Sequence, residues 1–328
     1  MMDLNETTKR GRKINKIHSN PSYNQNASEE ANTSSGVVIA NFGNQVLVQD
    51  VNNFHYRCPQ RNAISQLVTG DKVLIREDES TVDCDLTARV VAKLPRKNEL
   101  SRPNTQKKLC PIAANIDFIV IVVACAPTPQ LELIDRYVVA SEASGITPIL
   151  VLNKSDLLEE DKELKESISD LLTIYEKLDY VIVNTSAKQH RIKNLKEFLK
   201  DKTSVLVGQS GVGKSSLINE LLSRNASKVG PLSKGINKGT HTTTVAQLFN
   251  MDMGGSIIDS PGIREFDLWH ISPKEVERSF REFSTYIDKC RFRDCRHRAE
   301  PNCAIKEAVR TGFISEMRLR SFHSITQQ

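Results

Sequence analysis

The sequence predicts a multidomain chain with an N-terminal β-barrel, a central α/β domain built on a parallel sheet, and a small helical C-terminal module. Its 328 residues suit two to three domains. About five short β-branched runs lie between residues 36 and 95. Residues 203–222 have the pattern of a strand, a glycine-rich loop and a helix. Three cysteines and a histidine lie close together between residues 290 and 303. These three patterns belong to three different architectures.

The N-terminal arm, residues 1–35, is polar, rich in Asn and Ser and short of apolar residues, so we expect it to be disordered. Its positive charges are concentrated in one short stretch, which contains Lys9, Arg10, Arg12, Lys13 and Lys16. Basic arms of this kind add non-specific affinity for nucleic acid. The chain has no apolar stretch suited to a signal peptide or a membrane span. We therefore expect a cytoplasmic monomer with reduced cysteines and no membrane partner.

Residues 36–107 are expected to form the barrel. Short apolar runs alternate there with turn signals such as Gly43-Asn44 and Gly70-Asp71. The clearest runs are residues 37–40, 45–48, 72–75 and 86–91. About five short strands suit an OB-fold, which is a common platform for single-stranded nucleic acid. Many small barrels bind proteins instead, so the strands alone leave both kinds of partner open.

A phosphate-binding loop is predicted between a strand at residues 203–207 and a helix at residues 216–222. The segment matches G-x-x-x-x-G-K-[ST], and it consists of Gly208, Gln209, Ser210, Gly211, Val212, Gly213, Lys214 and Ser215, with Ser216 following. Glycines let backbone N–H groups close around phosphate oxygens at a helix N-terminus. We expect Lys214 to reach the β- and γ-phosphates and the Ser215 hydroxyl to bind Mg²⁺.

A guanine-reading tetrapeptide follows the apolar strand predicted at residues 146–152. It consists of Asn153, Lys154, Ser155 and Asp156. The Asp156 carboxylate can accept hydrogen bonds from guanine N1–H and the 2-amino group, a donor pair that adenine lacks, which gives roughly 10⁴-fold selectivity. A strand at residues 180–185 precedes Ser186, Ala187 and Lys188. The backbone N–H groups of these three residues could donate to guanine O6. Together with the phosphate loop, these segments indicate GTP.

Two further segments are predicted to sense the γ-phosphate. The strand at residues 256–258 leads into Asp259-Ser-Pro-Gly262, where Asp259 would hold Mg²⁺ through water and the Gly262 N–H would contact the γ-phosphate. Residues 238–244 are rich in threonine, and Thr242 or Thr243 would supply a second hydroxyl to Mg²⁺. A run of threonines can also reflect β-propensity alone.

The residue that would orient the attacking water is missing from its usual place. Ile263 follows the D-x-P-G segment, where Ras-like proteins carry a glutamine. Intrinsic hydrolysis is therefore expected to be slow unless another group or a partner completes the site. His241 is the candidate catalytic residue nearest to that role, alongside Lys214 and Gly262. The alternative interpretation of His241 is that it is an exposed loop histidine without a catalytic role.

The order of the motifs predicts the topology of the central domain, residues 108–268. The guanine-reading tetrapeptide precedes the phosphate loop along the chain, which indicates a circularly permuted α/β P-loop GTPase domain. The continuous apolar run at residues 116–123 predicts a buried parallel strand. The permutation also puts the exit of the chain next to Gly262. A C-terminal module attached there could act as a nucleotide-gated lever.

The C-terminal module, residues 269–328, is predicted to bind one structural Zn²⁺. The spacing C-x₄-C-x-H-x₅-C offers three sulfurs and an imidazole from Cys290, Cys295, His297 and Cys303. Four protein ligands leave no open position for catalysis. Between residues 289 and 328 there are nine Lys/Arg against four Asp/Glu, a balance suited to phosphate backbones or simply to a solvated surface. Apolar spacing from residue 304 to 322 predicts two short helices broken at Gly312.

The motifs, in their order along the chain, resemble those of the circularly permuted GTPase family. The flanking barrel and Cys/His cluster are similar to the ribosome small-subunit-dependent GTPase A branch of that family, over roughly residues 36 to 325. Thr240 stands where that branch has an arginine, and Gly211 stands where potassium-activated GTPases have an asparagine. The resemblance implies a GTPase that is stimulated by the small ribosomal subunit, contacts its rRNA, and acts in its late maturation.

Two other functions remain open at this point. The flanking modules could bind protein, which would make the chain a regulatory or translation-factor GTPase. Because Ile263 removes the usual water-orienting group, the chain could also be a GTP-sensing RNA-binding protein with negligible hydrolysis. GTP turnover with and without small subunits distinguishes these possibilities.

Overall fold

The computed structural model describes most of the chain from residue 33 onward. The described residues are 33–60, 64, 66–77, 87–103, 106, 108–223, 245–259 and 271–327. The disordered arm predicted for residues 1–35 thus lies almost wholly outside them. So do the predicted γ-phosphate-sensing residues His241, Thr242, Thr243 and Gly262, as well as Ile263.

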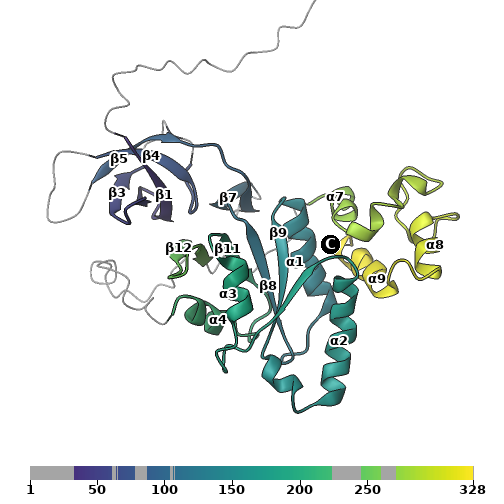
Figure 1. The fold of residues 1–328 in the computed structure, drawn as a ribbon. Coiled ribbons are helices and arrows are strands. Elements are labelled where there is room, and N and C mark those ends of the chain that lie inside the picture. Colours follow the sequence, from purple (N-terminus) through teal and green to yellow (C-terminus); the bar gives the residue numbers. More distant parts are fainter. Residues whose placement is uncertain are drawn as a thin grey trace, which may run out of the picture.

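Within its described residues, the N-terminal domain is a ring of five short strands (Figure 1). The strands are β1 (Ser34–Asn41), β2 (Gln45–Asp50), β3 (His55–Pro59), β4 (Lys72–Glu77) and β5 (Ala88–Lys93). Strand β1 pairs antiparallel with β2 and β4, β2 pairs with β3, and β4 pairs with β5. A parallel bridge between Arg57 and Thr87 joins β3 to the segment before β5 and closes the ring. Alternate apolar residues such as Val38, Val48 and Ile75 fill its interior. A small barrel is thus present, starting at Ser34 rather than residue 36, and its designation as an OB-fold stays a prediction.

A β-hairpin connects the barrel to the central domain. It consists of β6 (Glu99–Pro103) and β7 (Leu109–Ala114), which pair antiparallel across the predicted domain boundary at residue 107. The Asn115 side chain donates to the Gly70 carbonyl at 2.9 Å, and Arg96 pairs with the fully buried Asp71 at 2.7 Å. These bonds attach the residues on either side of the hairpin to the barrel.

The central domain is a mostly parallel sheet with helices on both faces (Figure 1). Its strands, in spatial order, are β10 (Val181–Asn184), β9 (Thr147–Asn153), β8 (Phe118–Ala124), β11 (Thr203–Val207), β13 (Ser256–Asp259) and the antiparallel β12 (Gln247–Asn250). Continuous apolar runs place β8, β9 and β11 in the middle of the sheet, where both faces are buried.

The helices divide between the two faces of this sheet. One apolar cluster contains residues of α1 (Leu131–Ala143) and α2 (Lys162–Glu176). A second contains residues of α3 (Lys193–Leu199) and α4 (Lys214–Leu221). Among the helices of the described residues, none is both long and apolar enough to cross a bilayer.

The barrel and the central sheet are joined edge to edge. Ala40 of β1 pairs with Gln247 of β12, so the strands of both domains form one continuous sheet. The Thr69 hydroxyl adds a bond of 2.9 Å to the carbonyl of Ala246. Strand β12 follows the predicted threonine-rich segment, and β13, its antiparallel partner, ends at Asp259. The barrel is therefore bonded to the strand that lies between the two predicted γ-phosphate sensors.

The C-terminal module is built from short helices around a cluster of aromatic rings. They are α7 (Pro273–Arg278), η4 (Arg281–Phe283), η5 (Ile287–Lys289), α8 (Ala304–Arg310) and α9 (Glu316–Ile325). The break between α8 and α9 contains Gly312, whose φ of 80° a side chain would disfavour, which confirms the predicted interruption. Rings of Phe280, Phe283 and Phe322 pack with centroids 4.9 to 5.6 Å apart.

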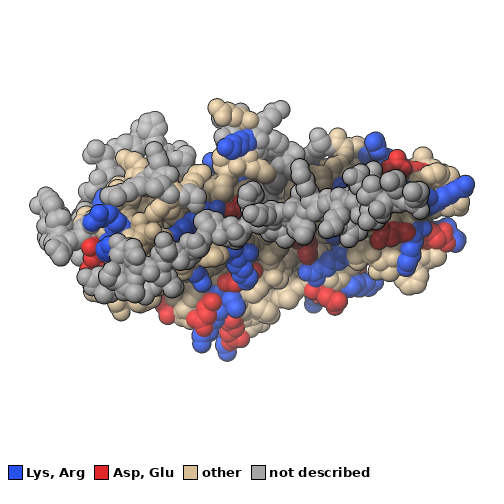
Figure 2. Space-filling model, turned by 90° about the horizontal axis from the view of Figure 1, so that it is seen from above, with Lys and Arg blue, Asp and Glu red and all other residues tan. Residues whose placement is uncertain are grey.

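The surface of this module carries charges of both signs. On the face seen in Figure 2, Lys and Arg are interspersed with Asp and Glu at the end of the molecule that holds the module. Part of its positive charge is neutralised locally, because Arg310 pairs with Glu307 and Arg320 with Glu316 along their helices. Arg318 is buried. The excess of basic residues therefore remains, but it does not form a surface of a single sign.

The module is anchored to α1 by a buried ion cluster, which we call the Arg318 cluster (Arg318, Asp135, Glu282 and Tyr175). The guanidinium of Arg318 on α9 pairs with Asp135 of α1 and, at 2.6 Å, with Glu282. Tyr175 of α2 donates to Asp135 at 2.6 Å. The guanidinium also lies over the Phe280 ring, 4.3 Å from its centroid. Side-chain exposures of 1% for Arg318 and 0% for Asp135 show that this interface excludes water.

Candidate functional site

The phosphate loop runs from the end of β11 into α4 at the middle of the sheet. Its glycines allow a backbone that other residues would resist. Gly208 has a φ of 142°, and a Cβ there would collide with the Val122 carbonyl of the neighbouring strand. Gly213 has a φ of 97°, and a Cβ there would collide with the Asn153 side chain. Replacing either glycine would therefore push the loop away from the strands that support it.

Lys214 and Ser215 begin the helix that follows the loop. The Lys214 ammonium donates to the carbonyls of Gly208 and Gln209 at 2.6 and 2.8 Å, so it lies beneath the loop. The first N–H groups of α4 have no partners within the helix and carry its partial positive charge. A cation and a helix N-terminus at one place form a binding site for an anion such as a phosphate.

Asn153 joins the predicted guanine-reading segment to the predicted phosphate loop. Its side chain is buried, and its amide donates to the Val212 carbonyl at 2.9 Å. Its amide oxygen accepts from the Ala187 N–H at 3.2 Å and from the Thr185 hydroxyl at 3.3 Å. Three segments that are distant in sequence therefore meet at one side chain. Losing the Asn153 side chain would leave several buried polar groups without partners.

Lys154 and Asp156 follow Asn153 in the same segment, which the bonds of Asn153 hold in place. Lys154 has a φ of 59°, and its ammonium donates to the carbonyls of Ala126 and Gly211 at 2.7 and 2.8 Å. Asp156 accepts from the Ser186 hydroxyl at 2.6 Å. Each carboxylate oxygen has two lone pairs. The bond to Ser186 therefore orients the carboxylate and still leaves acceptors for two further donors.

The two motifs line one open pocket of about 720 Å³, a volume typical of small-molecule sites. Predicted residues that line it are Asn153, Lys154, Asp156, Ala187, Lys188, Gly213 and Ser216. The pocket is also lined by four residues that the motifs do not predict, Leu157, His190, Asn219 and Glu220. Ser155 and Ser186 lie beside it and bond to neighbouring segments. The four missed residues follow the motifs by only a few positions, and that proximity was the available signal.

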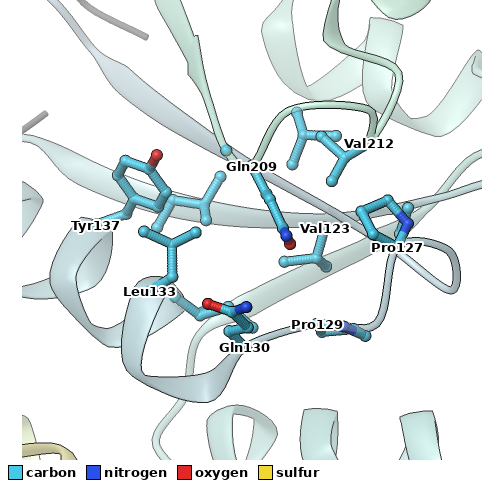
Figure 3. A pocket seen from close by; sticks show the side chains of 13 residues that line it. Val123, Pro127, Pro129, Gln130, Leu133, Tyr137, Gln209 and Val212 are labelled. Carbon is cyan, nitrogen blue, oxygen red and sulfur yellow. The ribbon is translucent and has the colours of Figure 1, made fainter. Parts of the chain in front are cut away.

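Behind the phosphate loop, α1 packs closely against it. A small cavity of about 10 Å³, space for a single water, lies between the loop and the first turn of α1 (Figure 3). In Figure 3 the Gln209 side chain points towards Gln130 and Val123 in this space. Leu133 and Tyr137 of α1 line the opposite wall. The loop is therefore supported from behind by the same helix that carries Asp135 of the Arg318 cluster.

Two predicted magnesium ligands lie at one edge of the sheet. Strands β11 and β13 are parallel neighbours, so the phosphate loop and Asp259 both follow carboxyl ends at that edge. Ser215 supplies a hydroxyl and Asp259 a half-buried carboxylate. Oxygen ligands of this kind suit Mg²⁺. These residues therefore fit a hydrated magnesium ion bound with a phosphate ligand.

The predicted metal ligands of the C-terminal module come together. One ligand atom from each of Cys290, Cys295, His297 and Cys303 lies within 4.8 Å of the others. The Nδ1 atom of His297 is 3.3 Å from the Cys303 sulfur, and its Nε2 donates to Glu277 at 2.7 Å. A carboxylate that accepts a hydrogen bond from one imidazole nitrogen orients the other nitrogen towards a metal ion.

The thiols of this cluster need a cation to ionise together. Burial, and then the neighbouring cysteines, raise the pKa of Cys295 to about 12. Burial likewise raises the pKa of Cys303. A bound dication reverses this preference, because it stabilises each thiolate directly. Three sulfurs and one nitrogen, without an open position, fit a structural tetrahedral ion.

Comparisons with known proteins agree with this geometry. The model of the RsgA GTPase family matches residues 93–269, more than half of the chain. The chain belongs to the RsgA GTPase family. A relative from Pseudomonas syringae pv. syringae (strain B728a), named small ribosomal subunit biogenesis GTPase RsgA, is 46% identical over 88% of this chain and 84% of its own length. A relative of the same name from Hahella chejuensis is 44% identical over 98% of this chain and 91% of its own.

Solved structures of similar proteins extend the RsgA assignment to the fold. The crystal structure of YjeQ from Thermotoga maritima matches with a TM-score of 0.71 and 32% identity, covering 90% of this chain and 98% of that one. YloQ, described as a circularly permuted GTPase, matches with a TM-score of 0.71 and 26% identity, covering 91% and 96%. The circular permutation predicted from the order of the motifs is thus confirmed, as is the resemblance to this family.

Proposed function

We propose that this chain hydrolyses GTP, slowly alone and faster when bound to the small ribosomal subunit, and that it acts in the late maturation of that subunit. The observation that carries the GTP assignment is the pocket between Asp156 and the phosphate loop, whose two walls Asn153 joins. The ribosomal role is supported by the curated relatives, which are named small ribosomal subunit biogenesis GTPases.

Guanine recognition is assigned to Asp156 and to the loop after β10. Asp156 accepts from N1–H and the 2-amino group, and the stem of Lys154 covers the base. The Ser186 N–H donates to the Arg191 carbonyl, and the Ala187 N–H donates to Asn153. Lys188 lines the pocket, so its N–H is the donor that we assign to guanine O6.

Phosphate binding is assigned to the loop from Gly208 to Gly213, together with Lys214. When GTP binds, the Lys214 ammonium would leave a loop carbonyl and contact the β- and γ-phosphate oxygens. It would then neutralise the negative charge that develops on these oxygens during phosphoryl transfer. Ser215 and Asp259, with Thr242 or Thr243, would hold Mg²⁺. When bound, that ion supplies charge neutralisation to the β- and γ-phosphates.

Slow intrinsic turnover follows from Ile263, because an alkyl side chain can neither orient nor deprotonate water. We assign the Gly262 N–H to the γ-phosphate and His241 to the water. The small subunit would complete this arrangement by positioning these residues at the γ-phosphate. Loss of the γ-phosphate on hydrolysis would then weaken binding to the subunit.

The C-terminal cluster is assigned one structural Zn²⁺, held by Cys290, Cys295, His297 Nδ1 and Cys303. Glu277 orients the imidazole. The barrel, with its proposed OB-fold, and the basic C-terminal module are assigned to rRNA. We further propose that the protein is a cytoplasmic monomer with three domains, the barrel, the central domain and the C-terminal module, divided near residues 107 and 268.

GTP turnover with and without purified small subunits tests this function. We expect the rate constant under single-turnover conditions to rise by orders of magnitude on adding subunits. Lys214→Ala serves as the matched control, because it should lose turnover in both conditions. An unchanged rate across a series of subunit concentrations would overturn the ribosomal role. Absence of any turnover, with GTP binding retained, would instead favour a GTP-sensing binding protein.

A further inference from the structure

The loop of residues 186–191 is a compact turn fixed at its base. The Ser186 N–H donates to the Arg191 carbonyl at 3.1 Å, and the Arg191 N–H donates back to the Ser186 carbonyl at 2.9 Å. The Ser186 hydroxyl binds Asp156. The base of the loop therefore belongs to the guanine-reading wall of the pocket.

His190, the residue before Arg191 in this loop, reaches α4 on the other wall of the pocket. His190 Nδ1 donates to the Glu220 carboxylate at 2.7 Å, and both residues line the nucleotide pocket. The Glu220 side chain is 18% exposed and the His190 side chain is 60% exposed. The bond therefore lies at the rim of the pocket, with the carboxylate enclosed and the imidazole near solvent. Because α4 begins with Lys214, this bond connects the guanine wall to the phosphate wall.

We propose that the His190–Glu220 bond is a latch at the rim of the pocket, which positions the guanine-reading loop and slows nucleotide release. The proposal rests on the assigned function as a guanine nucleotide-binding enzyme. At the floor of the pocket, Asn153 already joins the two walls through Val212. A second link at the rim fixes the width of the opening. His190 and Glu220 are thus positioning residues, which act on the nucleotide through the loop.

The backbone at His190 decides which substitutions can test the latch. Its φ is 56°, a region that Gly and Asn tolerate and that Ala resists. His190→Gly therefore removes the donor without adding strain, and His190→Asn keeps an N–H donor. On α4, Glu220→Ala removes the acceptor, and the alanine that replaces it favours the helix. Glu220→Gln keeps an acceptor oxygen.

Dissociation of a fluorescently labelled GDP, measured by stopped flow with excess unlabelled GDP, is the readout. Loss of a partly exposed hydrogen-bonded pair should raise the dissociation rate constant about two- to fivefold in His190→Gly and in Glu220→Ala. The double variant should release GDP no faster than either single variant, because both remove the same bond. His190→Asn and Glu220→Gln should stay near wild type. Lys193→Ala is the matched control, since its side chain is 89% exposed on the adjoining helix.

Three outcomes would overturn the latch. Release rates could be equal in all variants. The two single effects could multiply in the double variant, which would mean that the residues act independently. The melting temperature of the nucleotide-free protein could fall with no change in release, which would leave the pair a merely structural contact. Failure of the wild-type protein to bind GDP at all would instead refute the proposed function, so the two failures are distinguishable.

Discussion

Replacing Arg318 by methionine removes the cation that lies between the buried carboxylates of Asp135 and Glu282. Methionine fills much of the same volume, so the packing loss over Phe280 is small and the electrostatic change dominates. Removing one partner of a buried ion pair costs about 3–5 kcal/mol, because the remaining charges stay desolvated. We expect the free energy of unfolding to fall by about that amount at neutral pH.

The pH dependence of this loss identifies its cause. Burial raises the pKa of Asp135 in the native protein, and Arg318 opposes that rise. Without Arg318 the pKa should climb further above its unfolded value. The native variant then binds more protons than the unfolded chain, so its stability rises as pH falls, by up to about 1.4 kcal/mol per pH unit for one proton. The difference between wild type and variant should therefore shrink from pH 8 to pH 5.5.

Urea unfolding followed by circular dichroism measures the total loss. Amide hydrogen exchange of residues 304–325 shows whether α8 and α9 detach first. Adding Asp135→Asn and Glu282→Gln to the variant should restore most of the stability, because no buried charge is then left unpaired. A loss below about 1 kcal/mol that does not change with pH would refute the interpretation of this cluster as a desolvated ion network.

Three further results are expected from the sites. Asp156→Asn should shift preference from guanine towards xanthine nucleotides in a competition assay, and unchanged GTP selectivity would remove Asp156 from base recognition. Metal analysis of protein from zinc-replete cells should find about one zinc per chain, lost in Cys295→Ser, and metal-free wild-type protein would refute the zinc assignment. Glu277→Gln should weaken zinc affinity about 10–100-fold in a chelator competition, with an unchanged affinity showing that Glu277 does not orient His297.

The parts of the site that the sequence predicted are those built from short segments with fixed backbone geometry. A strand, a glycine-rich turn and a helix determine the phosphate loop locally, so Gly208 and Lys214 could be located from spacing alone. The segment proposed to read guanine is predicted in the same way, because it begins where the buried strand β9 ends. The Cys/His cluster also depends on spacing within one short stretch.

The parts that the sequence did not predict depend on side chains that meet across the fold. His190 and Glu220 are thirty positions apart, and Asp135 and Arg318 are 183 positions apart. No local pattern marks such pairs, because an exposed histidine and an ordinary helical glutamate are common in any sequence. The sequence places Arg318 among the basic residues suited to a polyanion, whereas its guanidinium is buried against α1. The spacing of apolar residues predicts which face of a helix is buried, but it does not predict which element packs against that face.

The Arg318 cluster also constrains how the nucleotide can influence the C-terminal module. The permutation suggested a lever attached at the chain exit near Gly262. The module is in addition fixed to α1, and moving it away from that helix would expose or unpair the buried charges at a cost of about 3–5 kcal/mol. Leu133 of the same helix lines the cavity behind the phosphate loop, two residues from Asp135. A displacement of the module that keeps the cluster intact must therefore move α1 as well. Because α1 packs behind the phosphate loop, such a displacement would also shift the support of that loop.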